Sequence, residues 1–283
     1  MKELKVKEVM TGKVIHVSAP GKKADAIRLL IENKISGLPV VKKDTMKLVG
    51  IITRKNIFDQ PHEQQVAMLM TKDPVSVTPD TSLREAVTIM LEKGLRRLPV
   101  VQGEKLVGIL TMMDILRIVE KERFETPIEN HLGGPCVPVF EGTPLKVAAT
   151  IFDVSKAYAL PVLDACGCVV GIVTDYDIFS CTSLDTKTVM SSMGLGNDED
   201  AWNPEGIRNL MRLYYEISEK ELPNIPVKKV MVKDPETVTK KTSISEAARR
   251  MRAQNFRQLP VVDDNDRLVA MLFDVDLMSV LLK

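Results

Sequence analysis

The sequence predicts an α+β fold built from four copies of one β-α-β-β-α unit, paired into two modules. The first observation is a repeated tripeptide. Leu-Pro-Val begins at Leu38, Leu98, Leu160 and Leu259. A methionine or leucine also stands 28 residues before each copy, at Met10, Met70, Leu132 and Met231. Four copies with the same internal spacing indicate a repeated structural unit.

A third observation places a helix before each Leu-Pro-Val. In the last three copies, apolar residues follow the i, i+3, i+4, i+7 spacing of an amphipathic helix. These residues are Leu83, Ala86, Val87 and Met90; Leu145, Ala148, Ala149 and Phe152; and Ile244, Ala247, Ala248 and Met251. The first copy keeps Ala26, Ile27 and Leu30 but has Lys23 in the first position. The helices are therefore expected in the same register in all four copies.

Each unit also contains three predicted strands. A short strand with alternating apolar residues comes first, at Ile15 and Val17, Val75 and Val77, Val137 and Val139, and more weakly at Glu236 and Val238. The Leu-Pro-Val strand follows the helix, and its proline, which lacks an N–H, suits the start or edge of a strand. A polar hairpin leads to the third strand, which enters a second helix. This order predicts a mixed sheet with helices on one face.

The predicted repeats cover residues 1–64, 65–125, 126–182 and 227–283. A unit of about 55 residues buries little apolar surface alone. We therefore expect the first repeat to pair with the second and the third with the fourth. Residues 183–226 are expected to form a helical insertion, in which Asn203 and Pro204 predict a helix start and apolar residues follow at helical spacing. This helix is expected either to pack on a neighbouring unit or second chain, or to dock a partner.

The composition disfavours several classes of protein. Lys and Arg number 39 and Asp and Glu 38, so the net charge gives no reason to expect nucleic-acid binding. No apolar run approaches the ~20 residues of a membrane span, and the first residues are unlike a signal peptide, so a soluble, cytoplasmic protein is expected. The four cysteines lie between Cys136 and Cys181, and Cys166-x-Cys168 has no second pair, so neither a metal site nor a disulfide framework is expected.

The repeated unit resembles a known domain. The combination of Val-Met-Thr, an amphipathic helix, Leu-Pro-Val-Val and Leu-Val-Gly-Ile-x-Thr-x-x-Asp-Ile is similar to the CBS domain (cystathionine-β-synthase domain). The resemblance extends over the chain apart from the insertion. It implies that the repeats pair into Bateman modules, which bind adenosine-containing ligands in clefts between repeats and regulate another protein. Four repeats in one chain resemble archaeal stand-alone CBS proteins and the nucleotide-sensing γ subunit of AMP-activated kinase.

The resemblance implies that Gly-x-x-Thr-x-x-Asp holds the ribose, with the Asp accepting from both ribose hydroxyls and the Thr reaching the ribose or phosphate. A carboxylate suits a vicinal diol because each of its oxygens can accept one bond. The matching residues are Thr111 and Asp114, Thr174 and Asp177, Thr53 and Asn56, and, in the fourth copy, Phe273 and Asp276. Asn56 predicts a weaker or altered site, and Phe273 in place of a hydroxyl predicts a poor fourth site. Thr-x-x-Asp before a helix is also a capping box, an alternative that requires no ligand.

The resemblance places phosphate contacts just before Leu-Pro-Val, often to a ligand centred on the partner repeat. The second copy has Arg96 and Arg97 there, and a guanidinium can bond phosphate bidentately. Secondary candidates are Arg54, Lys55 and Arg257. The third copy has the uncharged Tyr158 and Ala159, so a ligand with little phosphate is expected between copies three and four. The alternative for a lone arginine is a solvated surface position.

The resemblance also implies an adenine pocket formed by residues of the first strands. The candidates are Ile15, Val17, Val75, Val77, Val137 and Val139. Backbone amides of these strands could read the edge of the base. Ordinary core packing is the alternative for each of them.

The predicted function is that of a regulatory protein that senses AMP, ADP, ATP or S-adenosylmethionine and needs no cofactor. An unidentified protein partner is expected to read the ligand state, and a homodimer of stacked Bateman modules is a further expectation. The alternative is an assembly adaptor with vestigial clefts. An enzyme is not expected, because the repeats leave no room for a catalytic domain and no Gly-x-Ser-x-Gly, His-Glu-x-x-His or P-loop motif is present.

Overall fold

The computed structural model describes residues 4–33, 35–53, 56–57, 60, 63–155, 157, 159–174, 177 and 222–282. These residues fall into two compact units. The first unit takes its described residues from 1–86 and 94–111, and the second from 87–93, 112–183 and 221–283. The helical stripe predicted within the insertion lies outside the described residues.

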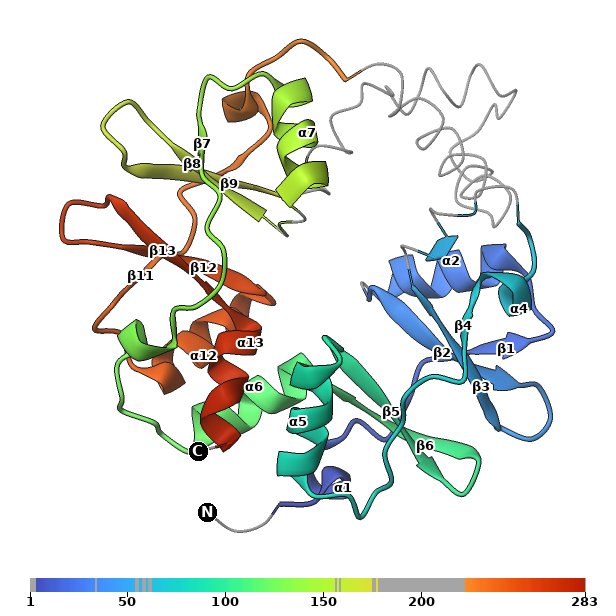
Figure 1. Cartoon of the computed structure of the whole chain (residues 1–283). Helices are drawn as coiled ribbons and strands as arrows, with labels where there is room; N and C mark the ends of the chain where they lie inside the picture. Colours follow the sequence, from blue (N-terminus) through green and yellow to red (C-terminus); the bar gives the residue numbers. More distant parts are fainter. Residues whose placement is uncertain are drawn as a thin grey trace. The chain divides into compact units, whose positions relative to one another are not determined.

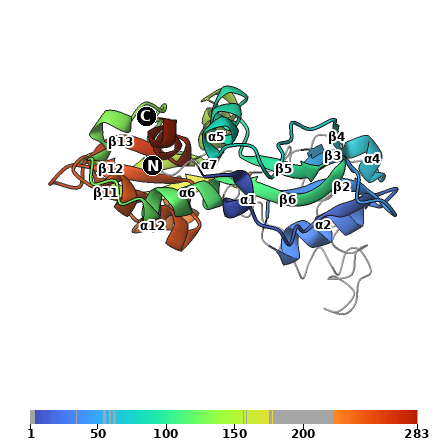
Figure 2. The same cartoon turned by 90° about the horizontal axis from the view of Figure 1, so that it is seen from below.

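The first unit holds the elements of the first two repeats up to the end of β6 (Figure 1). They are α1 (Val6–Val9), β1 (Val17–Ala19), α2 (Lys23–Glu32), β2 (Gly37–Lys42), β3 (Leu48–Thr53), α4 (Val66–Leu69), β4 (Thr71–Lys72), β5 (Arg97–Gln102) and β6 (Lys105–Thr111). Helix α5 (Leu83–Glu92) is divided between the units after Ala86. Figures 1 and 2 show α2 and α4 beside the strands β1 to β3, on which they pack.

The second unit holds the elements of the last two repeats together with helix α6. They are α6 (Met112–Lys121), η1 (Ile128–His131), β7 (Val139–Phe140), α7 (Leu145–Ser155), β8 (Ala159–Leu163), β9 (Val169–Thr174), η2 (Val227–Lys229), β10 (Val232–Lys233), β11 (Val238–Thr239), α12 (Ile244–Gln254), β12 (Gln258–Val262), β13 (Leu268–Phe273), α13 (Asp274–Met278) and η3 (Ser279–Leu282). The mixed α+β architecture predicted from the repeat is therefore confirmed.

The four Leu-Pro-Val hairpins have the same register. In each, the leucine lies opposite an apolar residue of the following strand: Leu38 opposite Ile52, Leu98 opposite Leu110, Leu160 opposite Val173 and Leu259 opposite Leu272. The register shifts at the same step of every hairpin, two to three residues further on. All four leucines are fully buried, which explains why the tripeptide recurs.

The helix stripes face the cores as their spacing predicts. Eleven of the twelve residues of the three stripes are buried and the twelfth, Ala149, is half-buried; Ala26, Ile27 and Leu30 of the first copy are buried as well. Lys23 is also buried, and its ammonium donates to the carbonyl of Gln60 (3.4 Å). A buried lysine is tolerated here because its charge reaches a backbone oxygen.

The first strand of each repeat is shorter than its alternating pattern predicts. Val17, Val77, Val139 and Val238 pair in parallel with the Leu-Pro-Val strand, Val77 through a single bridge. Ile15, Val75 and Val137 lie outside these strands. The chain ahead of Ile15 and Val75 pairs with the other repeat of the same unit, through Thr11 in the first case and β4 in the second.

This exchange of strands links the repeats of each unit. Strand β4, from the start of the second repeat, pairs with β3 of the first, and Thr11 of the first repeat pairs with Ile109 in β6 of the second. In the second unit, β10 from the fourth repeat pairs with β9 of the third. Each of these sheets is therefore completed by a neighbour, which fits the expectation that a single repeat is too small to fold alone.

A methionine and a glycine meet at each exchanged strand. Met70 lies against Gly50, Met10 against Gly108 and Met231 against Gly171, so closely that a Cβ on the glycine would overlap the thioether. Glycine is required at these positions because any side chain would displace the methionine. The fourth repeat has Ala270 in the glycine position, and the third has Leu132 in the methionine position.

The hairpin tips of paired repeats are joined in the same way in both units. Leu48 N–H donates to Glu104 O (2.9 Å) and Leu106 N–H to Met46 O (2.9 Å). In the second unit, Val169 N–H donates to Asp266 O (3.0 Å) and Leu268 N–H to Gly167 O (3.3 Å). Each unit is thus a pair of repeats with matching reciprocal bonds, as the sequence predicts.

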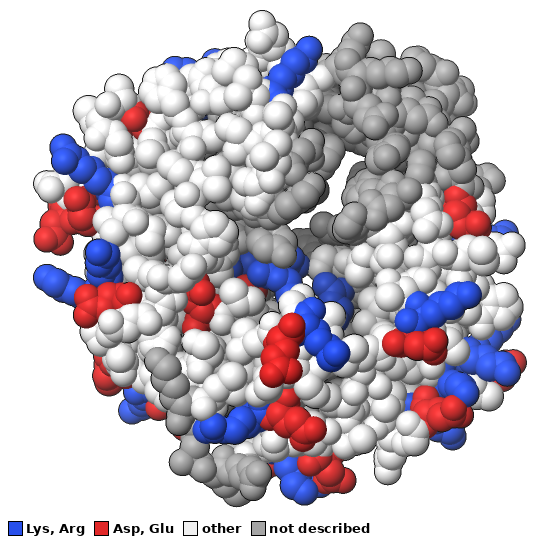
Figure 3. All heavy atoms as spheres, viewed as in Figure 1, with Lys and Arg blue, Asp and Glu red and all other residues white. Residues whose placement is uncertain are grey.

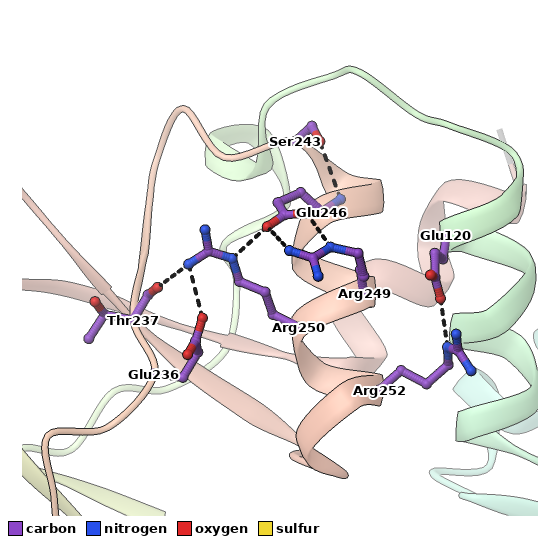
Figure 4. Close-up of polar contacts among 8 residues, drawn as sticks. All are labelled: Glu120, Glu236, Thr237, Ser243, Glu246, Arg249, Arg250 and Arg252. Atoms are coloured by element: carbon purple, nitrogen blue, oxygen red, sulfur yellow. Dashed lines mark hydrogen bonds and ion pairs between the residues drawn. The ribbon is translucent and has the colours of Figure 1, made fainter.

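Helix α12 has a dense polar surface, shown in Figure 4. Glu246 accepts from Arg249 (2.6 and 2.7 Å) and from Arg250 (2.8 Å), and Arg250 also donates to Glu236 (3.1 Å). The bonds from the two guanidinium groups lower the pKa of Glu246 to about 2. Ser243 caps the start of the helix by accepting from Glu246 N–H (3.3 Å).

Helix α6 packs against α12 and α13 within the second unit. Arg252 of α12 donates to Glu120 of α6 (2.6 Å). Ser245 accepts from Phe124 N–H (2.6 Å) and donates to Val119 O (2.8 Å), so its hydroxyl joins α12 to the end of α6. The last helix of the second repeat therefore contributes to the unit that holds the fourth repeat.

The surface charge agrees with the balanced composition. On the face shown in Figure 3, basic and acidic side chains are interspersed, and no broad region of one sign is seen among the described residues. Within the same part of the chain, no helix has the length and apolar character needed to cross a membrane.

Candidate ligand-binding sites

The first candidate site lies where β3 ends. Asn56 Oδ1 accepts from the Thr53 N–H (2.9 Å) and from the Thr53 hydroxyl (2.6 Å), and Asn56 N–H donates to Thr53 Oγ1 (3.2 Å). This is the capping-box arrangement that the motif predicts. Because both Thr53 groups donate, the oxygen of the Asn56 amide must face them and its NH₂ points away. The NH₂ donates weakly to Thr71 Oγ1 (3.4 Å).

Arg97 reaches this site from the second repeat. Its Nη2 donates to Ser36 Oγ (2.7 Å), and its Nη1 lies so close to Gly37 that a Cβ there would overlap it. Gly37 is opposite Thr53 in the β2–β3 ladder, so Arg97 is held at the strand end that carries the Thr53–Asn56 motif. The guanidinium of one repeat is thus placed beside the polar motif of the other.

The third repeat repeats the first motif with a carboxylate. Asp177 Oδ2 accepts from the Thr174 N–H (2.8 Å) and from the Thr174 hydroxyl (2.7 Å), and Asp177 N–H donates to Thr174 Oγ1 (3.4 Å). Both bonds from Thr174 use one carboxylate oxygen, and Oδ1 makes no hydrogen bond to a described residue. Asp177 can therefore bond both Thr174 groups and still offer an acceptor to a ligand.

The second-repeat motif is divided between the two units. Thr111 ends β6 in the first unit, and Asp114 lies in the first turn of α6 in the second, so the two residues are described separately. Asp114 is 7% exposed and accepts from Arg117 Nη2 (3.4 Å). An ion pair compensates part of the cost of burying this carboxylate.

The fourth-repeat position is filled by an aromatic ring. Phe273 is 8% exposed, and its ring lies against Gly134 so closely that a Cβ on that glycine would overlap it. The Phe273 N–H donates to Asp276 Oδ2 (2.8 Å), so the capping bond survives although the hydroxyl is lost. Glycine at position 134 lets the backbone of the third repeat approach the ring.

Burial raises the pKa of Asp276 to about 6, and the nearby Asp274 charge adds to this rise, while the bond from Phe273 N–H opposes it. The folded state therefore keeps the proton up to about pH 6, whereas the unfolded chain releases it near pH 4. The free energy of unfolding should fall as the pH rises from about 4 to about 6, because the unfolded state binds fewer protons in this window.

Asp276→Asn should remove this pH dependence while keeping an acceptor for Phe273 N–H. We expect the variant to gain stability relative to the parent as the pH rises from 4 to 7, measured by urea unfolding at several pH values. Asp263→Asn is the control, because the N–H groups of Arg267 and Asn265 lower the pKa of Asp263 and its effect has the opposite sign. Parallel stability curves for Asp276→Asn and the parent would contradict the assignment.

The adenine candidates fall into two groups. Val17, Val77 and Val139 are each 5% exposed and contribute to the cores, where a ligand could not reach their side chains. Ile15 and Val75 are 36% exposed, and Val137 is half-buried, so these three are the more accessible surfaces for a base. In each of these segments, one of the two alternating residues faces the core and the other is more exposed. The sequence pattern alone does not say which of the two is exposed.

The remaining basic candidates are less well placed. Arg96 is half-buried next to Arg97, and Arg257 is exposed at the equivalent position of the fourth repeat. Arg54 and Lys55 lie outside the described residues. Ser36 and Gly37 contact Arg97, and Gly134 contacts the Phe273 ring, although the sequence motifs predict a role for none of the three. For positions 36 and 37 the sequence does offer a signal, because both residues are small where the second repeat has two arginines.

The described part of the chain contains no candidate metal-binding site. No three His, Cys, Asp or Glu side chains gather there as a metal site would require. Cys166 is exposed and Cys168 half-buried in the hairpin between β8 and β9, where both backbone N–H groups donate to Asp164 (2.8 and 2.9 Å).

Comparison with known proteins identifies four matching segments. The family model described as "CBS domain" matches residues 6–63, 66–121, 133–182 and 227–283. A crystal structure of an uncharacterized conserved protein from Pyrococcus horikoshii is 31% identical, with a TM-score of 0.68 and coverage of 98% of this chain and 100% of that chain. Protein MJ1225 from Methanocaldococcus jannaschii, proposed as an archaeal homolog of g-AMPK, shares the fold at 22% identity, with a TM-score of 0.73 and coverage of 98% and 100%.

Two further relatives match over part of their length. Protein MJ0188 from M. jannaschii is 37% identical over 130 residues, which are 45% of this chain and 48% of that protein. Inosine-5′-monophosphate dehydrogenase from Korarchaeum cryptofilum is 34% identical over 189 residues, which are 64% of this chain and 35% of the dehydrogenase. The chain thus spans about half of the first relative and about a third of the second.

Proposed function

The chain belongs to the CBS-domain family, with four domains that cover most of its length, and on this premise we propose that it is a regulatory protein that binds adenosine-containing ligands. The ligands proposed are AMP, ADP, ATP or S-adenosylmethionine. Binding would shift a conformational equilibrium that a protein partner reads. Coupling of this kind typically amounts to about 1–3 kcal/mol.

The observation that carries the proposal is the arrangement around the end of β3. The Thr53–Asn56 motif and the Arg97 guanidinium come from different repeats and lie at one strand end. Hydrogen-bonding groups there suit a ribose, and a planar cation suits a phosphate.

The third repeat supports the same function with different chemistry. Asp177 keeps one carboxylate oxygen for a ligand while its other oxygen serves Thr174. The motif of the fourth repeat offers a ligand fewer hydrogen-bonding groups, because the Phe273 ring, packed against Gly134, takes the place of the threonine hydroxyl. We therefore propose that the chain binds ligand at the motifs of the first three repeats and not at the fourth.

The proposal also concerns activity. We propose that the chain is not an enzyme, because the match to the dehydrogenase covers 35% of that protein and coincides with residues of the CBS domains. The described residues of this chain are accounted for by repeats and their connections. Its role would then be to report ligand concentration to a partner rather than to transform the ligand.

Thermal and chemical unfolding with added ligand tests the proposal. AMP, ADP, ATP and S-adenosylmethionine are each added to the full chain, with GMP as a control that keeps the ribose phosphate but changes the base. A ligand at 100 times its dissociation constant should raise the free energy of unfolding of the unit that binds it by about 2.7 kcal/mol. If none of the four adenosine ligands stabilises the chain more than GMP does, the proposal fails and an assembly role is favoured.

A further inference from the structure

We propose that Cys166 and Cys168 form a reversible oxidation site, at which a small-molecule disulfide converts the two thiols into an internal disulfide bond. The two cysteines flank Gly167 at the tip of the hairpin between β8 and β9. This tip lies apart from the Thr-x-x-Asp motifs and from Arg97. No adenosine ligand takes part in the reaction, so the site is independent of the proposed function.

The backbone of the tip brings the two cysteines together. The N–H groups of Cys166 and Cys168 both donate to Asp164 Oδ1 (2.8 and 2.9 Å), and Gly167 between them has a φ of 83°. Glycine adopts this positive φ without strain, so the chain turns at the residue between the cysteines. Consecutive Cα atoms are about 3.8 Å apart, and two cysteines on either side of one turn residue therefore fall near the ~4.4–6.8 Å that a disulfide spans.

Solvent reaches the two thiols unequally. Cys166 is exposed and Cys168 is half-buried. Free cysteines are usually among the most buried residues, so an exposed thiol beside a second one is unusual for a packing role. Partial burial, followed by the charge of the Asp164 carboxylate, raises the pKa of the Cys168 thiol, which therefore stays protonated near neutral pH. Cys166 is thus the thiol that an oxidant meets first.

The half-buried thiol contacts the other repeat of the unit. Cys168 Sγ donates to Asn265 O (3.4 Å) in the hairpin of the fourth repeat, and Cys168 lies opposite Arg267 in an antiparallel bridge. Its neighbours Gly167 and Val169 make the reciprocal backbone bonds that join the two hairpins. A change in the position of Cys168 therefore acts directly on the junction between the third and fourth repeats.

Two other hairpins show that a tip of this kind forms without thiols. In the fourth repeat, the tip carries Asn265 and Arg267, whose N–H groups donate to one oxygen of Asp263 (2.9 and 3.0 Å). The first repeat has Thr45 and Lys47 at the equivalent positions. The fold of the tip does not depend on cysteine, so the thiol pair adds a chemical property that these hairpins lack.

The oxidation consists of two thiol–disulfide exchanges. The Cys166 thiolate attacks one sulfur of the oxidant RSSR and expels RS⁻, which leaves a mixed disulfide on Cys166. The Cys168 thiolate then attacks the Cys166 sulfur, forms the internal disulfide and expels the second RS⁻. The two protons lost by the cysteines pass to the two RS⁻ groups, so the oxidant is reduced to two RSH. The same steps in reverse restore the dithiol.

The fold favours the reduced pair. In the unfolded chain, a single intervening residue already keeps the two cysteines close, so folding adds little to their proximity. In the folded unit, closing the disulfide turns Cys168 Sγ away from Asn265 O. Loss of one hydrogen bond corresponds to a change of about fivefold in the oxidation equilibrium. A disulfide that the fold disfavours is readily reduced, which suits a reversible switch and not a structural crosslink.

Intact mass and thiol titration test whether the internal bond forms. The full chain with Cys136→Ala and Cys181→Ala keeps only the pair, and oxidised glutathione is the oxidant. We expect both remaining thiols to be lost and the mass to fall by about 2 Da, with no glutathione attached. Cys166→Ser and Cys168→Ser in this background are the controls, and each should retain one glutathione. Attached glutathione or disulfide-linked dimers in place of the internal bond would overturn the proposal.

Two further measurements test the order of attack and the reversibility. Cys168→Ser, which leaves the exposed Cys166, should react with oxidised glutathione about tenfold faster than Cys166→Ser. The equilibrium constant for oxidation, measured in glutathione buffers, should be about fivefold lower in the folded chain than in urea. Equal rates would overturn Cys166 as the attacking thiol. An equilibrium constant that is equal or higher in the folded chain would identify a structural disulfide and overturn the switch.

Discussion

Arg97→Ala should lower the affinity of the chain for AMP by about ten- to a hundredfold, while adenosine affinity changes by less than about threefold. Hydrogen bonds to charged groups contribute about 1.5–3 kcal/mol each, which corresponds to this range. The guanidinium is held by Ser36 at 2.7 Å, so its position is set before ligand arrives and little order is lost on binding. Calorimetry with both ligands measures the difference.

Arg28→Ala is the matched control for this prediction. Arg28 lies on α2 in the same unit, where it pairs with Asp25 and Glu32 at the surface, so its loss should change AMP affinity by less than twofold. An equal loss of AMP and adenosine affinity in Arg97→Ala would mean that Arg97 supports the fold of the site and does not contact phosphate.

Gly37→Ala provides an independent route to the same result. The added Cβ would overlap Arg97 Nη1 and would stand 3.1 Å from Ile52 O, so the guanidinium must move. The double variant with Arg97→Ala should bind AMP no worse than Arg97→Ala alone, because the two changes remove one interaction. If the losses of AMP affinity are additive instead, Gly37→Ala does not act through Arg97.

The largest expected loss of stability comes from Phe273→Ala, at about 3–5 kcal/mol. Its ring fills the position where other repeats carry a threonine, and it packs against Gly134 of the third repeat. Removing the ring leaves a cavity where Phe273 of the fourth repeat meets Gly134 of the third. Denaturant unfolding of the second unit, followed by circular dichroism, measures the loss.

Phe140→Ala is the control, since Phe140 is 51% exposed in the same unit and its removal should cost less than about 1 kcal/mol. Gly134→Ala sharpens the test. In the parent, the added Cβ would overlap the Phe273 ring and should destabilise the unit, whereas in Phe273→Ala the same change should be close to neutral. If Gly134→Ala lowers the free energy of unfolding equally in the parent and in Phe273→Ala, the added Cβ does not meet the Phe273 ring.

Much of the fold follows from local patterns in the sequence. The Leu-Pro-Val leucines and the helix stripes are buried as predicted, because burial depends on periodicities of two and 3.6 residues that are visible within one repeat. The hydrogen bonds expected of a capping box are also present at Thr53 and Thr174, since they connect residues only three positions apart.

The remaining features depend on contacts between repeats, which no local pattern contains. The first strand of the first repeat is shorter than expected because Thr11, which precedes it, pairs with Ile109 in β6, about a hundred residues later. The resemblance implied that a basic residue serves the partner repeat, but the contact of Arg97 with Ser36 and Gly37 required the fold. The sequence likewise does not predict the role of Gly134, because that role depends on the Phe273 ring that lies against it in the fold.

The exchange of strands between repeats also determines when the protein can fold during its synthesis. Thr11 pairs with Ile109, so the first repeat stays incomplete until the chain beyond residue 109 has left the ribosome. Until then, Met10 lacks Gly108 as its packing partner, and the strand edge that receives β4 is exposed whenever the second repeat has not yet emerged. The first pair of repeats should therefore form as a single co-translational step rather than one repeat at a time.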